Sequence, residues 1–297
     1  MAGCQKNSDN PSSVNPYPEL SIDTSEKQII ITEQASASVR IYDQPTRLLL
    51  WSWQASDSQV TSNRSSWFSL PSEAKPLKDA SCLLVTASGG GAAIIRISDR
   101  KVLFCAAPKG NPHGGEILPD GNVAISSSDG YISIYPYDED SPFMSSYLNR
   151  FSLDGAHSVL WDKKRSCLWA VGTSMLVSYS YESASLSVLK SFFLPSSYGH
   201  DLVPVYGEDN LMITTGSGVY TFDPNTEAFK AVEGARNVSN VKSVSTGPSG
   251  FTTICTIPTE SWYTPEVLGL YTGLRAFFLQ DAHIYKARWR VGNEFSY

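Results

Sequence analysis

Short apolar stretches with alternating polar positions recur along this chain, and tight polar turns join them in pairs. The clearest example spans residues 111–128, where one short strand, the turn Pro119-Asp120-Gly121 and a second alternating strand follow one another. Proline presets φ for such a turn and glycine tolerates positive φ, so the chain is expected to reverse here. The pattern predicts antiparallel β-hairpins.

The same hairpin pattern occurs five times, each time after a basic residue. Histidine introduces three copies and lysine two, at Lys75, His113, His157, His200 and Lys242. The copies follow one another at intervals of about 40 residues, a repeat length typical of β-propellers. The chain of 297 residues is therefore predicted to be all-β, a six-bladed β-propeller with about four antiparallel strands per blade.

The first and last parts of the repeat region are expected to share a blade. Residues 27–53 contain three strands and lack an innermost one, while residues 283–291 alternate well enough to supply it. A ring closed by strands from both chain ends leaves no exposed sheet edge at the seam. We therefore predict one propeller domain over residues 27–297, with no amphipathic helix.

Four cysteines occur within this region, three of them in the apolar strand after a turn. They are Cys82, Cys105, Cys167 and Cys255. A small hydrophobic side chain packs at such positions, so buried free thiols are expected.

Residues 1–26 differ in composition from the rest of the chain. They are polar and rich in serine and proline, and Ala2-Gly3-Cys4 resembles the end of a bacterial lipobox. We expect a flexible tether with a lipid on Cys4, which places the protein in the cell envelope, anchored to the outer membrane, or secreted. The alternative is a chance Ala-Gly-Cys at a cytosolic terminus.

Charge and hydropathy exclude several kinds of partner. The net charge is -6 and no long basic run occurs, which argues against nucleic-acid binding. No apolar run reaches the length of a membrane helix, so membrane contact is expected only through a lipid on Cys4. We expect a monomer.

The sequence also contains no phosphate-binding loop, no nucleophile elbow and no paired carboxylates for glycoside hydrolysis.

Several phrases resemble a known family. They are the segment 111–122, the segment 157–169, Gly199-His200-Asp201-Leu202 and Tyr285-Lys286-Ala287-Arg288-Trp289. Together they are similar to a family of uncharacterised six-bladed propeller proteins, secreted lipoproteins of Bacteroides-type bacteria. The resemblance implies the fold and a surface location, and it supplies no reaction and no catalytic residues.

The basic residues that introduce the repeats are the candidate site. The innermost strands of a propeller begin at one mouth of its channel, so Lys75, His113, His157, His200 and Lys242 are expected to form a ring there. Polar residues at this rim could instead serve only to hydrogen-bond the backbone and channel water. Trp262 and Tyr263 lie in an insertion of the sixth blade on the same face. They are expected either to form a stacking platform for a sugar ring or only to cover the irregular sixth blade.

The chemistry of this ring favours an anion over a metal. Lysine and protonated histidine give charge-assisted hydrogen bonds to carboxylate or phosphate. The alternative is zinc or manganese on His113, His157 and His200, which the two lysines oppose. We predict a small anionic ligand, an acidic sugar or glycan fragment. A lyase or isomerase acting on a uronic acid and a protein-interaction platform remain the alternatives, so binding and catalysis are both open.

Overall fold

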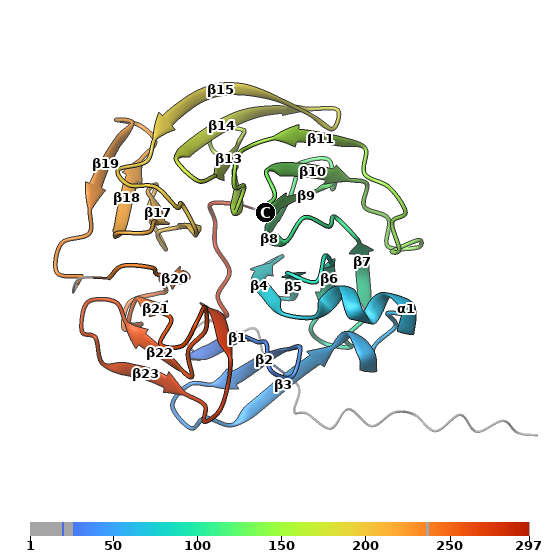
Figure 1. Cartoon of the computed structure of the whole chain (residues 1–297), viewed down its shortest axis with the longest axis horizontal. Helices are drawn as coiled ribbons and strands as arrows, with labels where there is room; N and C mark the ends of the chain where they lie inside the picture. Colours follow the sequence, from blue (N-terminus) through green and yellow to red (C-terminus); the bar gives the residue numbers. More distant parts are fainter. Residues whose placement is uncertain (1–19, 21–25, 236–237, 297) are drawn as a thin grey trace, which may run out of the picture.

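Six four-stranded antiparallel sheets surround a central channel in the computed structural model, which describes residues 20, 26–235 and 238–296 (Figure 1). Each sheet is one blade, and consecutive blades follow the chain around the ring. The predicted six-bladed propeller with four strands per blade is confirmed.

The first three blades contain strands β1 to β11 in chain order, and the last strand, β24, joins blade one. Blade one contains β1 (Gln28–Glu33), β2 (Ser38–Asp43), β3 (Leu49–Gln54) and β24 (Ile284–Trp289). Blade two contains β4 (Pro71–Leu77), β5 (Cys82–Ala87), β6 (Ala92–Arg96) and β7 (Val102–Ala106). Blade three contains β8 (Pro112–Ile117), β9 (Val123–Ser127), β10 (Tyr131–Tyr135) and β11 (Asn149–Ser152).

The remaining three blades have the same order of strands. Blade four contains β12 (Ser158–Asp162), β13 (Cys167–Val171), β14 (Met175–Glu182) and β15 (Ser185–Phe193). Blade five contains β16 (Leu202–Pro204), β17 (Leu211–Thr214), β18 (Val219–Asp223) and β19 (Ala228–Ala231). Blade six contains β20 (Ser243–Ser245), β21 (Ile254–Thr256), β22 (Glu266–Gly269) and β23 (Arg275–Phe278).

The ring closes through blade one, where both ends of the propeller meet. Strand β24 pairs antiparallel with β1, with Ile29 opposite Trp289 and Ile31 opposite Ala287. The C-terminal strand therefore becomes the innermost strand of the first blade, as its alternation predicts. This pairing covers the edge of β1 that would otherwise be open.

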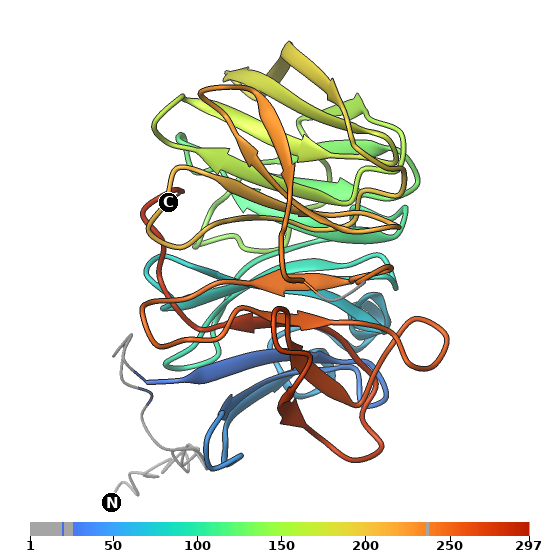
Figure 2. The same ribbon diagram turned by 90° about the vertical axis from the view of Figure 1, so that its left-hand side faces the viewer.

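The two faces of the ring differ. Innermost strands run in one direction along the channel, so their first residues share one face, which we call the histidine face. On the opposite face the chain leaves β24 and residues 290–296 cross the channel (Figures 1 and 2). There the backbone N–H of Lys163 donates to the carbonyl oxygen of Phe295 at 3.0 Å.

The core consists of apolar layers between neighbouring blades. One layer combines Leu118 and Ala124 of blade three with Val159, Trp161 and Leu168 of blade four, all buried. Trp161 therefore packs between blades. Cys82, Cys105, Cys167 and Cys255 are buried free thiols, as expected.

The connection between β3 and β4 contains three short helical turns. It contains the 3-10 helix η1 (Ala55–Asp57), the single-turn helix α1 (Ser62–Ser65) and the 3-10 helix η2 (Ser66–Phe68). Within the described residues, no helix has the length and apolar character needed to cross a membrane. Most of the tether predicted over residues 1–26, including Cys4, lies outside the described residues.

Candidate functional site

Strand register identifies one equivalent position at the channel mouth in every blade. In blades three and four this position comes directly before a residue that pairs with the second strand. His113 precedes Gly114, which pairs with Ser126, and His157 precedes Ser158, which pairs with Val171. The occupants of this position, from blade one to blade six, are Tyr285, Ser72, His113, His157, His200 and Lys242. Four of the five basic residues expected at the mouth therefore occupy equivalent positions.

Three histidine rings and one tyrosine ring meet at this mouth. The ring centroid of His157 lies 4.7 Å from those of both His113 and His200, which are 6.1 Å apart. The Tyr285 hydroxyl lies 3.0 Å from Nε2 of His113 and 3.0 Å from Nε2 of His200. We call these four residues the histidine cluster.

Backbone carbonyls determine which nitrogen of each imidazole carries the proton. Nδ1 of His113 lies 2.8 Å from the carbonyl oxygen of Asn111, and Nδ1 of His157 lies 2.8 Å from that of Gly155. Nδ1 of His200 faces the carbonyl oxygen of Lys242 at 3.2 Å. A carbonyl oxygen only accepts, so each Nδ1 donates and each Nε2 keeps its lone pair.

The cluster consequently has more hydrogen-bond acceptors than donors. Tyr285 has one hydroxyl proton and faces two Nε2 atoms, so it can donate to only one of them. No group of the described residues donates to Nε2 of His157. The Nε2 lone pair of His157 is therefore open to a donor of a ligand.

Burial keeps all three imidazoles neutral at physiological pH. It lowers the pKa of His157 to about 4, and the charges of Lys286 and Lys242 act in the same direction. Burial and the neighbouring His157 lower the pKa values of His113 and His200 well below the usual range. Desolvation disfavours the imidazolium, so at neutral pH these histidines offer neutral hydrogen-bonding nitrogens to a ligand.

Lys242 supplies the positive charge of the mouth. Its half-buried ammonium has no carboxylate within 4 Å and no hydrogen-bond partner among the described residues. Burial lowers the pKa of Lys242, with a smaller effect of Lys286 in the same direction. Binding of an anion beside an unpaired, partly desolvated cation is energetically favourable.

A cavity of about 410 Å³ opens above the cluster. It is lined by His157, Thr173, Tyr198, Gly199, His200, Asn240, Lys242 and Tyr285. This volume lies within the range of sites for small molecules. The open lone pair of His157 and the ammonium of Lys242 therefore line one cavity.

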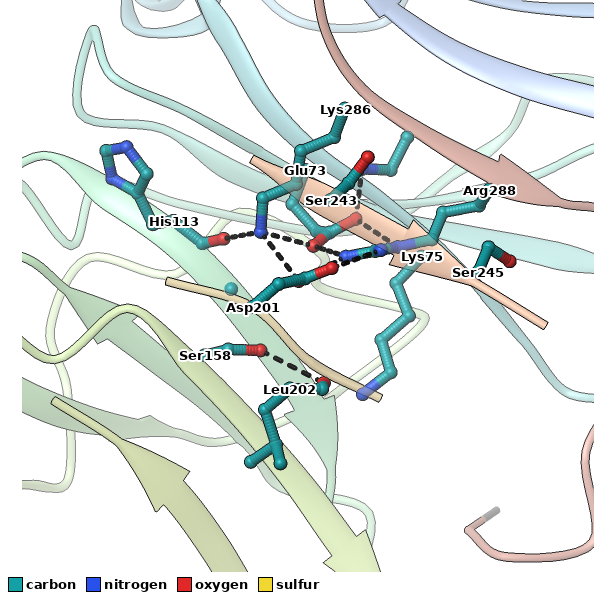
Figure 3. A network of polar contacts seen from close by, with 12 residues as sticks. Glu73, Lys75, His113, Ser158, Asp201, Leu202, Ser243, Ser245, Lys286 and Arg288 are labelled. Atoms are coloured by element: carbon teal, nitrogen blue, oxygen red, sulfur yellow. Dashed lines mark hydrogen bonds and ion pairs between the residues drawn. The ribbon is translucent and has the colours of Figure 1, made fainter. Parts of the chain in front are cut away.

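A buried ion network closes the channel directly beneath the cluster (Figure 3). Lys286 Nζ lies 2.9 Å from Glu73 Oε2 and 3.1 Å from Asp201 Oδ1, and Arg288 makes contacts of 2.6 Å with both carboxylates. Two acids thus balance two bases. Burial alone would raise the pKa of the Asp201 carboxyl, but Arg288 and Lys286 outweigh it and hold that pKa well below its usual range.

Lys75 does not lie at the mouth, which corrects the expected ring. It is opposite Leu84 within β4, three residues beyond Ser72, because β4 begins earlier than the repeat pattern indicates. Its Nζ lies 2.6 Å from Oε2 of Glu116, and it lines a small cavity in the channel below the network. Lys75 thus belongs to the ion pairs of the channel interior.

Trp262 and Tyr263 have different surroundings on the histidine face. The Trp262 side chain is half exposed, and its Nε1 donates to Oε1 of Gln34 at 2.9 Å. Tyr263 stacks on His283 with ring centroids 3.7 Å apart. The insertion is fixed beside the mouth because Thr264 forms a bridge with Ile284, the residue before Tyr285.

A larger cavity of about 730 Å³ lies on the opposite face, along the C-terminal segment. Two of its acidic residues are already paired, because Arg165 binds Asp162 at 2.8 Å and Asp209 at 2.7 Å, and Lys164 also binds Asp209. The histidine face, with its unpaired Lys242, is the stronger candidate. Over the described part of the chain, no three or more His, Cys, Asp and Glu side chains are placed to hold a metal ion.

A family model described as a family of unknown function, DUF6528, matches residues 2–297. The chain belongs to this family. No curated protein matches the chain.

Solved structures share the fold of this DUF6528 member. A crystal structure of a protein of unknown function from Bacteroides caccae is similar over 89% of this chain and 98% of that chain, with 13% sequence identity and a TM-score of 0.58. A chain in a crystal structure of the Mitotic Checkpoint Complex matches over 75% of this chain and 66% of its own length, with 13% identity and a TM-score of 0.52. At such identities the similarity shows the fold alone, and a propeller suggests a binding or interaction platform.

Tyr285 is a residue of the mouth that the pattern of basic residues does not predict, although it lies in the predicted closing strand. The signal was available, because Tyr285-Lys286 aligns with His200-Asp201 and with Lys242-Ser243 at the start of an innermost strand. Tyrosine in place of a basic residue concealed the equivalence.

Proposed function

We propose that this protein binds a small acidic sugar in the cavity above the histidine cluster. The observation that carries the proposal is the unpaired ammonium of Lys242 in one cavity with the open Nε2 lone pair of His157. Such a site complements a molecule with one carboxylate and neighbouring hydroxyl groups. The carboxylate binds Lys242, and a ligand hydroxyl donates to Nε2 of His157.

Binding is favoured over a lyase or isomerase reaction at the same residues. A general base is most effective when its pKa lies near the working pH, and the pKa of His157 is about 4. Burial raises the pKa of the Tyr285 hydroxyl far above its usual value, which makes it a weak acid. These groups are better suited to hydrogen bonding than to proton transfer.

An anionic ligand is also favoured over zinc or manganese on His113, His157 and His200. The charges of Lys242 and Lys286 that lower the pKa of His157 disfavour any bound cation in the same way. The proposal keeps the location expected from the N-terminal sequence, a cell-envelope protein with a lipid on Cys4.

Calorimetric titration with glucuronate and galacturonate tests the proposal, with glucose and galactose as neutral controls. Lys242→Met should weaken binding of the acid by about tenfold to a hundredfold, since a hydrogen bond to a charged group contributes about 1.5–3 kcal/mol. Lys109→Met is the matched control, because Lys109 is an exposed lysine that precedes β8 on the same face.

Equal binding by the Lys242→Met variant, or equal binding of glucose and glucuronate, would contradict the proposal. Metal analysis of the same natively purified sample separates the alternatives. Stoichiometric zinc or manganese that disappears in the triple variant His113→Ala, His157→Ala, His200→Ala would favour the metal. A protein partner retained by every mouth variant would favour an interaction platform.

A further inference from the structure

The cavity above the histidine cluster is closed at its base. The Nε2 atoms of His113 and His200 each lie 3.0 Å from the Tyr285 hydroxyl across the channel, and the side chains of Lys286 and Asp201 beneath them are fully buried. Residues 290–296 cross the channel on the opposite face (Figure 1). A ligand therefore enters from the histidine face only and cannot pass through the channel.

Two aromatic side chains are exposed on the histidine face. Tyr198 lines the cavity on the connection into blade five and is 73% exposed. Trp262, in the blade six insertion, is 48% exposed, is not part of the cavity lining and is oriented by its hydrogen bond to Gln34. Neither side chain belongs to the apolar core between the blades. Exposed aromatic groups beside a cavity are typical of binding surfaces.

We propose that the cavity recognises the terminal acidic sugar of an oligosaccharide, and that the following sugars lie over Tyr198 or Trp262. This inference rests on the proposed function and adds the form of the ligand. Because the cavity is closed at its base, a sugar bound deep in it leaves only the histidine face for the rest of the chain. A chain end needs one such exit, whereas a sugar substituted on both sides needs two.

Three ligands test the inference by calorimetry. They are methyl glucuronide, a trisaccharide with glucuronate at its non-reducing end and a trisaccharide with glucuronate in the middle, and the same three are prepared with galacturonate. The terminal trisaccharide should bind about tenfold more tightly than the methyl glycoside. The internal trisaccharide should bind at least tenfold more weakly than the terminal one.

Aromatic variants identify the surface that the additional sugars contact. Trp262→Ala should reduce the advantage of the terminal trisaccharide and leave the affinity for the methyl glycoside unchanged within about twofold. Tyr198→Ala, which also changes the cavity lining, should weaken the terminal trisaccharide more than the methyl glycoside. Phe193→Ala is the matched control, because Phe193 is an exposed aromatic at the end of the outermost strand of blade four. A thermal unfolding curve for each variant verifies folding.

The outcomes distinguish this inference from the proposed function. If the methyl glycosides bind and depend on Lys242, but internal and terminal trisaccharides bind equally, only the chain-end inference is overturned. The same holds if neither aromatic variant changes the affinity for the terminal trisaccharide. If none of the acidic ligands binds, the proposed function fails and this inference fails with it.

Discussion

Replacing Asp201 with asparagine should lower the free energy of unfolding by about 3–5 kcal/mol, because breaking a buried ion pair leaves uncompensated charge. The Asp201 carboxylate is fully buried and accepts from Lys286, from both terminal nitrogens of Arg288 and from the backbone N–H of Val244. Asparagine has nearly the same shape, but it carries no charge, and its NH₂ group would face the donor groups of Lys286 and Arg288.

The size of this effect depends on the location of the network. Lys286 and Arg288 belong to the closing strand β24, while Glu73 belongs to β4 and Asp201 directly precedes β16. The four charges therefore hold the C-terminal strand to blades two and five across the channel. A loss of 3–5 kcal/mol is a large part of the total stability of an ordinary domain.

Urea unfolding followed by tryptophan fluorescence measures the change. The matched control is Asp99→Asn, which removes one partner of the surface pair Arg96–Asp99 and should cost at most about 1 kcal/mol. An Asp201→Asn variant as stable as the Asp99→Asn variant would show that the network contributes little to ring closure.

Acidification from pH 6.5 to pH 4 should destabilise the protein strongly through the histidine cluster. In the unfolded chain each histidine titrates near pH 6.5, whereas in the folded protein burial lowers the pKa of His157 to about 4. Between these values the unfolded state binds protons that the folded state excludes, so stability falls as the pH falls.

For His157 alone, this pKa difference corresponds to roughly 3 kcal/mol at pH 4. His113 and His200 act in the same direction, since burial lowers their pKa values as well. Glu73 and Asp201, whose pKa values are also lowered, lose their contribution only in more acidic solution. Above pH 7 the three histidines should not contribute to the change of stability with pH.

Unfolding free energies measured at half-unit steps from pH 7.5 to pH 4 test this expectation. The His157→Gln variant should have a flatter profile by the contribution of one proton. The Phe193→Ala variant, which removes an exposed side chain without a titratable group, should retain the full slope. A profile that is flat between pH 6.5 and pH 4 would mean that the histidines are protonated in the folded protein.

The repeat allowed much of this structure to be predicted from the sequence. Blade number, the closing strand and the convergence of His113, His157 and His200 all follow from hairpins at a regular interval, because equivalent strand starts share one face. Lys75 was misplaced because the β4 register depends on an irregularity between Pro71 and Glu73 that composition does not indicate.

The chemistry of the mouth was less accessible to sequence analysis. The neutrality of the imidazoles depends on burial and on nearby charges, which are known only when the channel is assembled. The ion network joins Glu73, Asp201, Lys286 and Arg288, which are far apart in sequence, so no local pattern predicts it. The unpaired state of Lys242 likewise became apparent only after every carboxylate near the channel had been placed.

Histidine ¹⁵N NMR at pH 7, before and after addition of glucuronate or galacturonate, tests the central claim most directly. The chain has four histidines, and His283 serves as an internal reference because its ring stacks on Tyr263 outside the cluster. The account predicts neutral rings with a protonated Nδ1 for His113, His157 and His200, and a ligand-induced shift of Nε2 in His157. Imidazolium signals, or acid binding that leaves the Nε2 resonance of His157 unchanged, would contradict it.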